Sequence, residues 1–281
     1  MGQIHEDLAA AYYMEDSLER AQSHYEKSLA IRLKRLGPDD VLISNSYNGL
    51  GYVFAKQGKH EQALNAQESA LQIRTKALGP DDVSVAESYL NVGDALAALD
   101  KPGEAQDAYA KSLAIHLKAA EPDALAIADV REKIGGLHYQ QEHLAEARAM
   151  LEQALALNAK ALPAGHFRLA STNVSLGLVD AKEGKHRRAV EHFETALSLA
   201  AAAGLAESTD AADVRLWEAD SYRALGDKGL ALEAVNKAIA IYLAKLGPAH
   251  ASTQSALEKT AELCKGGYRP ACTETRPSAA P

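Results

Sequence analysis

Residues 78–82 read LGPDD. The same five residues stand at 36–40, and a variant, LGPAH, stands at 246–250. The first two copies are 42 residues apart, and the third follows after four more steps of 42. Glycine readily terminates a helix and proline cannot continue one, while Asp81 or Asp82 can cap the next helix. The motif therefore predicts a joint between two helices.

Other positions repeat with the same step of 42 residues along the chain. One is always alanine: Ala21, Ala63, Ala105, Ala147, Ala189 and Ala231. A second is always aliphatic: Leu29, Leu71, Leu113, Leu155, Leu197 and Ile239. A third always has little or no side chain: Ala9, Gly51, Gly93, Gly135, Gly177 and Ala219. Agreement at a constant spacing is the signature of a repeat protein.

Each repeat contains two helical patterns. In 60–78 the apolar residues Ala63, Ala70, Leu71 and Leu78 fall on one stripe with helical spacing, and the preceding stretch, 40–58, shows a second such stripe and ends at glycine. The helices of successive repeats meet at joints near 36–40, 78–82, 120–124, 162–166, 204–208 and 246–250. One repeat cannot bury its own stripe, so the repeats must stack. We predict an all-α superhelix, a helical solenoid of about six two-helix repeats.

The two ends of the chain are predicted to differ from the repeats. Residues 250–265 carry only a thin apolar stripe, as a C-terminal capping helix should, so the repeat domain spans 2–265. Residues 266–281 contain Gly266, Gly267 and three prolines and are expected to form a disordered tail. The first repeat begins almost at residue 2 without a cap, and we expect the chain to be a fragment of a longer protein, with Met1 and Gly2 left by cloning.

Composition excludes several functional classes. The formal net charge is −8, which disfavours nucleic acid, and no apolar run is long enough to span a membrane. There is no signal peptide, and the two cysteines, Cys264 and Cys272, are expected to be free thiols in a reducing compartment, so we expect a cytoplasmic protein. A disulfide between them is the alternative.

The repeat unit resembles the tetratricopeptide repeat (TPR). The resemblance rests on Leu50, Gly51, Phe54, Ala63 and Ala70 in the second repeat, and on Ala219, Tyr222, Ala231 and Ala238 in the sixth. The usual TPR has 34 residues. A step of 42 with an LGPD joint is similar to the longer variant of kinesin light chains and of many bacterial regulatory proteins. HEAT repeats, which also run to about 40–47 residues, are the alternative, but they do not require this alanine–glycine spacing.

The resemblance implies a concave groove, lined by the first helix of each repeat, that binds a peptide or a partner helix. The matching positions are Glu6, Ala10, Tyr13, Asn48, Tyr52, Glu87, Leu90, Asp94, Asp129, Glu132, Tyr139, Val174, Leu178, Leu216, Asp220 and Arg223. They do not reproduce the lysine–asparagine clamp that some members use for a C-terminal carboxylate. Glu87, Asp94, Asp129 and Glu132 instead make the middle negative, unlike the basic groove of kinesin light chains. We expect either a preference for a cationic or apolar segment or ordinary solvated helix surface.

No pattern of catalytic, cofactor-binding or metal-ligating residues is found in the sequence. Two carboxylates do break the repeat, because Asp180 and Glu218 stand where the other repeats carry mainly apolar residues. We expect a local shift in packing that leaves both solvated, with a role toward a ligand as the alternative.

The sequence therefore predicts a non-catalytic protein-interaction scaffold, part of a larger bacterial regulatory protein. Two alternatives stay open. One is a sensor of a peptide signal, and the other is the interaction domain of a truncated signalling enzyme such as a kinase.

Overall fold

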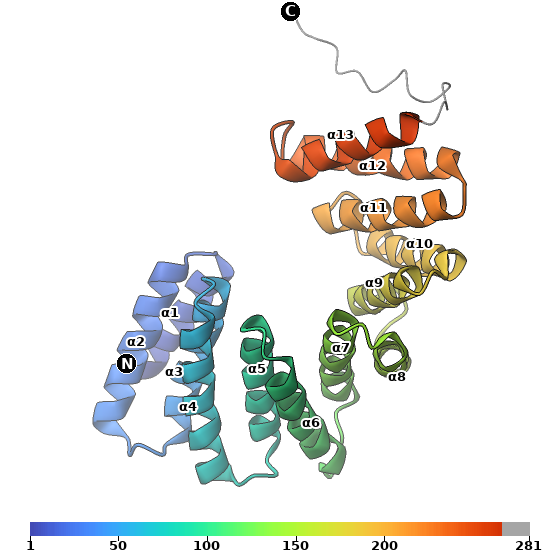
Figure 1. Cartoon of the computed structure of the whole chain (residues 1–281). Coiled ribbons are helices and arrows are strands. Elements are labelled where there is room, and N and C mark those ends of the chain that lie inside the picture. The colour runs from blue at the N-terminus through green and yellow to red at the C-terminus, as the bar shows by residue number, and fades with distance from the viewer. Residues whose placement is uncertain (266–281) are drawn as a thin grey trace, which may run out of the picture. The chain divides into compact units, whose positions relative to one another are not determined.

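The computed structural model describes residues 1–265, and in that part of the chain every regular element is an α-helix (Figure 1). The segment 266–281, for which the sequence predicts a disordered tail, lies outside the described residues. The helices are α1 (Gly2–Met14), α2 (Leu18–Arg35), α3 (Val41–Lys56), α4 (His60–Leu78), α5 (Val83–Ala98), α6 (Pro102–Lys118), α7 (Ala124–Gln140), α8 (Leu144–Ala161), α9 (Phe167–Lys182), α10 (His186–Ala202), α11 (Thr209–Ala224), α12 (Lys228–Lys245) and α13 (Ala251–Cys264).

The predicted all-α solenoid is confirmed, with two helices to each repeat and α13 after the sixth. The LGPDD motif acts at a helix joint. Gly79, with φ of 92°, ends α4, and the Asp82 carboxylate accepts a hydrogen bond of 2.8 Å from the amide of Ser84 to cap α5. Asp40 caps α3 in the same way. None of the helices in residues 1–265 has the length and hydrophobicity needed to cross a lipid bilayer.

The small residues of the repeat allow the first and second helices to approach closely. A Cβ atom added at Gly93 would lie 2.4 Å from the ring of Tyr109, and one at Gly177 would lie 2.5 Å from the ring of Phe193. Both rings are buried, so each fills the space that its glycine leaves. The small-residue position therefore exists because a large side chain of the second helix packs directly on the backbone of the first.

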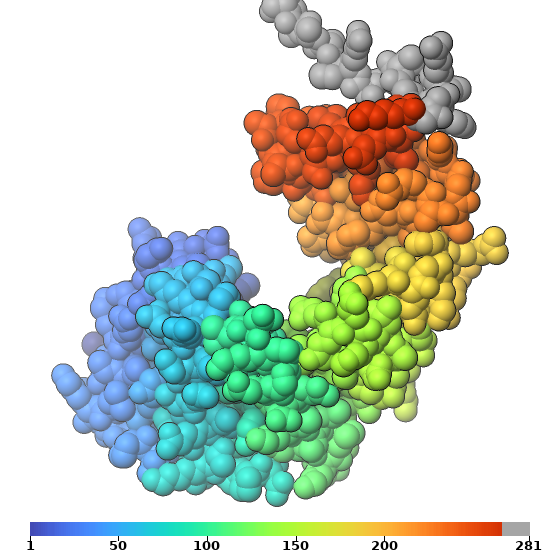
Figure 2. Space-filling model, viewed as in Figure 1, coloured from blue at the N-terminus to red at the C-terminus, as the bar shows by residue number. Residues whose placement is uncertain are grey.

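The chain forms two compact units, residues 1–137 and 138–281, and α7 spans the division. Within the first unit, α1 to α6 pack in sequence order, and within the second, α8 to α13 do so. The space-filling view shows the same order as bands of colour that follow one another through each unit (Figure 2). Contacts mainly between chain neighbours are the hallmark of a solenoid.

Asp180 and Glu218 are both buried, so the expectation that they are solvated is wrong. Asp180, on α9, is fully buried and accepts a hydrogen bond of 2.8 Å from Nη2 of Arg148, on α8. Burial, and secondarily the charge of Glu194, raises the pKa of Glu218 to about 7. One carboxylate is thus stabilised by a cation, whereas the other gains protons more readily.

The expectation of free thiols is wrong for Cys264, which is disulfide-bonded. The second cysteine of the sequence, Cys272, lies outside the described residues.

Candidate functional site

The candidate site is the surface formed by the first helices of the repeats, which we call the first-helix face. In the first unit it includes α3 and α5, and in the second it includes α9 and α11. The sequence-predicted groove residues lie on these helices or on α1 and α7. They fall into the two units, and each unit is described by itself.

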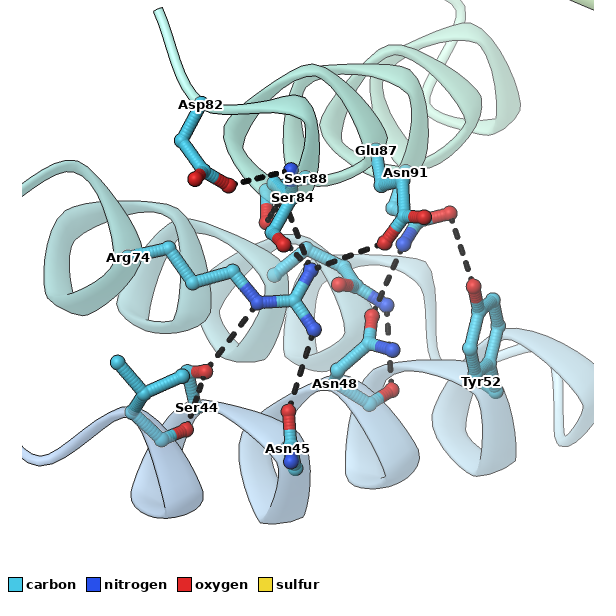
Figure 3. Close-up of polar contacts among 12 residues, drawn as sticks. Ser44, Asn45, Asn48, Tyr52, Arg74, Asp82, Ser84, Glu87, Ser88 and Asn91 are labelled. Atoms are coloured by element: carbon cyan, nitrogen blue, oxygen red, sulfur yellow. Dashed lines mark hydrogen bonds and ion pairs between the residues drawn. The ribbon is translucent and has the colours of Figure 1, made fainter. Parts of the chain in front are cut away.

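Polar side chains join successive first helices on this face. The Tyr52 hydroxyl, on α3, donates a hydrogen bond of 3.1 Å to Oδ1 of Asn91, on α5. Asn91 in turn donates a bond of 2.9 Å to the side chain of Asn48 (Figure 3). The Tyr52 side chain remains 44% exposed, so its ring is open to solvent beside this network.

The same pair of repeat positions is used again in both units. In the first unit, Lys133 lies 2.9 Å from Asp94, and in the second, Lys259 lies 2.6 Å from Asp220. Tyr52 and Asn91 occupy the equivalent positions, and each pair is separated by 39 residues. The first-helix face therefore carries a recurring cross-link whose chemistry changes from repeat to repeat.

The acidic middle predicted from the sequence is partly neutralised. Glu87 lies 3.6 Å from Nη1 of Arg74, and Asp94 is bonded both to Lys133 and to the Tyr109 hydroxyl at 2.7 Å. Burial lowers the pKa of Lys133, but the carboxylates of Asp94, Asp129 and Glu132 outweigh it and raise that pKa overall. Lys133 thus stays cationic among the acidic residues.

Buried arginines lie beneath the face in the first unit. Arg74 extends from α4 between α3 and α5, and its guanidinium donates to Ser44, Asn45 and Ser88 and to the carbonyl oxygen of Ser84 at 3.0–3.3 Å (Figure 3). Arg32, on α2, is buried in the same way and donates to Ser46 at 3.0 Å. Each arginine therefore ties its own repeat to the next one.

The predicted groove residues of the second unit differ in their surroundings. Val174 lines a cavity, Leu178 packs on the buried cluster around Phe193, and Leu216 packs on the cluster around Tyr242. Two further members interact with cations or lie close to a carboxylate: Tyr139 lies under Lys182 at 5.0 Å, and Arg223 lies 3.5 Å from Asp220. Leu90, in the first unit, is half-buried.

The cavity has a volume of about 420 Å³ and lies between α9, α10 and α11. Its walls are mainly apolar, and the aromatic side chains of Phe167 and Trp217 at its edge are 57% and 36% exposed. Binding pockets for small groups have volumes of about 300–1,000 Å³, so this cavity is large enough for one.

Sequence reasoning missed the residues that follow the predicted groove positions by one. Asn91, Lys133 and Trp217 share one repeat position, and each faces the site in its unit. The signal was available, because stepping by 42 residues from any one of them reaches the others.

Comparisons with known proteins agree with this architecture. The family model for the tetratricopeptide repeat matches residues 1–76, 42–118 and 84–160, which together cover more than half of the 281 residues. Comparison with curated proteins gives no match.

Solved structures share the fold at low sequence identity. BtubC (BKLC) from P. vanneervenii is 24% identical with a TM-score of 0.62, over 70% of this chain and 78% of that one. The nearly identical TPR-like repeats from Podosopora anserina, assigned as a kinesin light chain, are 21% identical with a TM-score of 0.60, over 71% and 94%. A Rap protein complexed with competence and sporulation factor is 16% identical with a TM-score of 0.64, over 93% and 74%. The chain therefore belongs to the tetratricopeptide repeat family and is similar to the repeats of kinesin light chains.

Proposed function

We propose that this chain is a non-catalytic scaffold that binds a peptide or a partner helix on its first-helix face. The observation that carries the proposal is the cavity of about 420 Å³ in that face, with the exposed aromatic rings of Phe167 and Trp217 at its edge. Solvent-exposed aromatic side chains beside an apolar cavity are the usual anchors of a binding surface.

The charge of the face supports a preference for a cationic or apolar segment. Asp210 and Asp213 line the cavity of the second unit, and Glu87 is exposed on the face of the first. The formal net charge of −8 has the same sign, which would favour encounters with a basic segment. Membership of a larger bacterial regulatory protein is a further part of the proposal.

The cellular compartment is a separate question. The sequence leads us to expect the cytoplasm, but the disulfide at Cys264 favours an oxidising compartment, where such bonds persist.

A peptide array tests the binding function. The purified chain is applied to an array of random-sequence peptides, together with two variants, Trp217→Ala on the first-helix face and Leu243→Ala on an exposed position of α12. We expect binding that Trp217→Ala weakens and Leu243→Ala leaves unchanged. A chain that binds no peptide, or binds equally well as Trp217→Ala, contradicts the proposal, and a preference for acidic peptides contradicts the charge argument.

A peptide-signal sensor is the second candidate, favoured by the fold shared with the Rap protein complexed with competence and sporulation factor. A sensor should change its curvature when a peptide binds. Small-angle scattering with and without a peptide from the array distinguishes the two, because a scaffold is expected to keep its radius of gyration and a sensor to become more compact.

A further inference from the structure

One buried position on the second helices links each repeat to the next. In five of the six repeats it carries a large polar side chain that is at least 93% buried: Arg32, Arg74, His116, Asn158 and Tyr242. In the fifth repeat the same position, reached by the step of 42 residues, is Ala200. Alanine lacks the atoms to cross the space between the repeats, so the fifth repeat should have a vacancy there.

The cavity of about 420 Å³ lies at this position, because Ala200 is one of the residues that line it. Its other walls are the equivalents of the residues around Arg74. Ser171 corresponds to Asn45, which accepts from Arg74, and Asp213 corresponds to Glu87, whose carboxylate lies 3.6 Å from Nη1 of Arg74. The cavity is therefore the space that the Arg74 side chain occupies in the second repeat.

The electrostatics of the cavity suit a cation. Asp210 and Asp213 both line it, and the described residues that form its walls include no lysine or arginine. One oxygen of Asp213, Oδ1, accepts a hydrogen bond from the buried Tyr242 hydroxyl, which holds the carboxylate in place. Two carboxylates beside an apolar cavity gain from a cation that enters it.

We infer that the cavity at Ala200 binds the arginine side chain of a partner peptide, in the place where the chain's own Arg74 lies in the second repeat. The guanidinium can bond to Asp213 as Arg74 does to Glu87, and its planar face can stack on Trp217 at the edge. The apolar walls, which include Val174 and Leu197, suit the aliphatic part of the side chain. This inference rests on the proposed function, since it names the group that the first-helix face recognises.

The chain carries its own reporter, because Trp217 is its single tryptophan and lies at the cavity. Its fluorescence is followed while a five-residue peptide, arginine between glycines and blocked at both ends, is added. Matched peptides carry citrulline, lysine, norleucine or glutamate in place of arginine. We expect a saturable change with arginine, at least tenfold weaker binding with citrulline, which has nearly the same shape without the charge, and weaker binding with each of the other three.

The variant Ala200→Arg should fill the cavity from within and abolish the response to the arginine peptide. Ala201→Arg, which adds the same side chain at the exposed neighbouring position, should leave the response intact. Thermal melting by circular dichroism confirms that both variants are folded. If Ala200→Arg does not fold, Asp213→Asn replaces it, because asparagine can still accept from Tyr242 but lacks the charge, and arginine binding should fall at least tenfold.

Three results overturn the inference: no saturable response to the arginine peptide, equal affinity for the citrulline peptide, or an unchanged response in Ala200→Arg and Asp213→Asn. A stronger response to norleucine would identify an apolar occupant and would also overturn it. If array peptides still bind, without arginine preference and despite Ala200→Arg, the proposed function stands while the inference fails. If no array peptide binds, both fail.

Discussion

Gly177 shows how a single residue sets the distance between two helices. Its backbone lies against the fully buried ring of Phe193, and an added Cβ would lie 2.5 Å from that ring. A ring packed on all sides cannot move away freely, so overpacking at such a position costs about 1–3 kcal/mol.

We therefore expect Gly177→Ala to lower the free energy of unfolding by about 1–3 kcal/mol, measured by urea titration followed by circular dichroism. Gly103→Ala, on α6, is the matched control because nothing lies within 4 Å of its added Cβ. That variant should gain roughly 0.5–1 kcal/mol from higher helix propensity. Equal effects of the two substitutions would contradict the packing argument.

Glu218 makes the stability of the fold depend on pH. Its pKa is raised by burial from 4.5 to about 7, so between these values the folded chain binds more protons than the unfolded chain. The free energy of unfolding contributed by this group is therefore highest below pH 4.5 and falls as the pH rises to about 7.

The variant Glu218→Gln keeps the shape of the protonated side chain and cannot ionise. We expect it to be more stable than the unaltered chain at pH 8 and about equally stable at pH 5, in paired urea titrations. A difference between the two proteins that is the same at both pH values would show that Glu218 does not titrate across this range.

At the scale of the element, the helix joints depend on one aspartate of each LGPDD motif. The sequence offers Asp81 or Asp82 as the cap of α5, and the structure selects Asp82, whose carboxylate lies 2.8 Å from the Ser84 amide. Loss of such a cap costs about 0.5–2 kcal/mol.

We expect Asp82→Ala to lower the thermal midpoint measurably, whereas Asp81→Ala, at the exposed neighbouring position, should leave it nearly unchanged. Differential scanning calorimetry of both variants measures the effect. A larger loss in Asp81→Ala would mean that the joint is held by the turn and not by the cap.

Much of the architecture could be predicted from the sequence because each repeat obeys the same local rules. The step of 42 residues, the glycine position exemplified by Gly177 and the aspartate caps are all expressed within one repeat. The pairing of Lys133 with Asp94 was not predicted, because it depends on which side chain the next first helix brings across. Ala200 is unremarkable by itself, since alanine is common in helices, and its meaning emerges only beside Arg74 and the cavity.

At the scale of the whole molecule, the helices contact mainly their neighbours in the chain, so a local perturbation should stay local. We expect Gly177→Ala to reduce protection from amide hydrogen exchange in α9, α10 and α11 and to leave α1 to α4 unchanged. Equal loss of protection in every helix would instead indicate a single cooperative fold.

The account rests most heavily on the claim that the first helices form the binding surface. Hydrogen exchange of the chain with and without the tightest-binding array peptide tests this claim directly. We predict that the peptide protects amides of α9 and α11 while those of α12 exchange as before. Protection confined to second helices such as α2, α4 and α12, with none on a first helix, would contradict it.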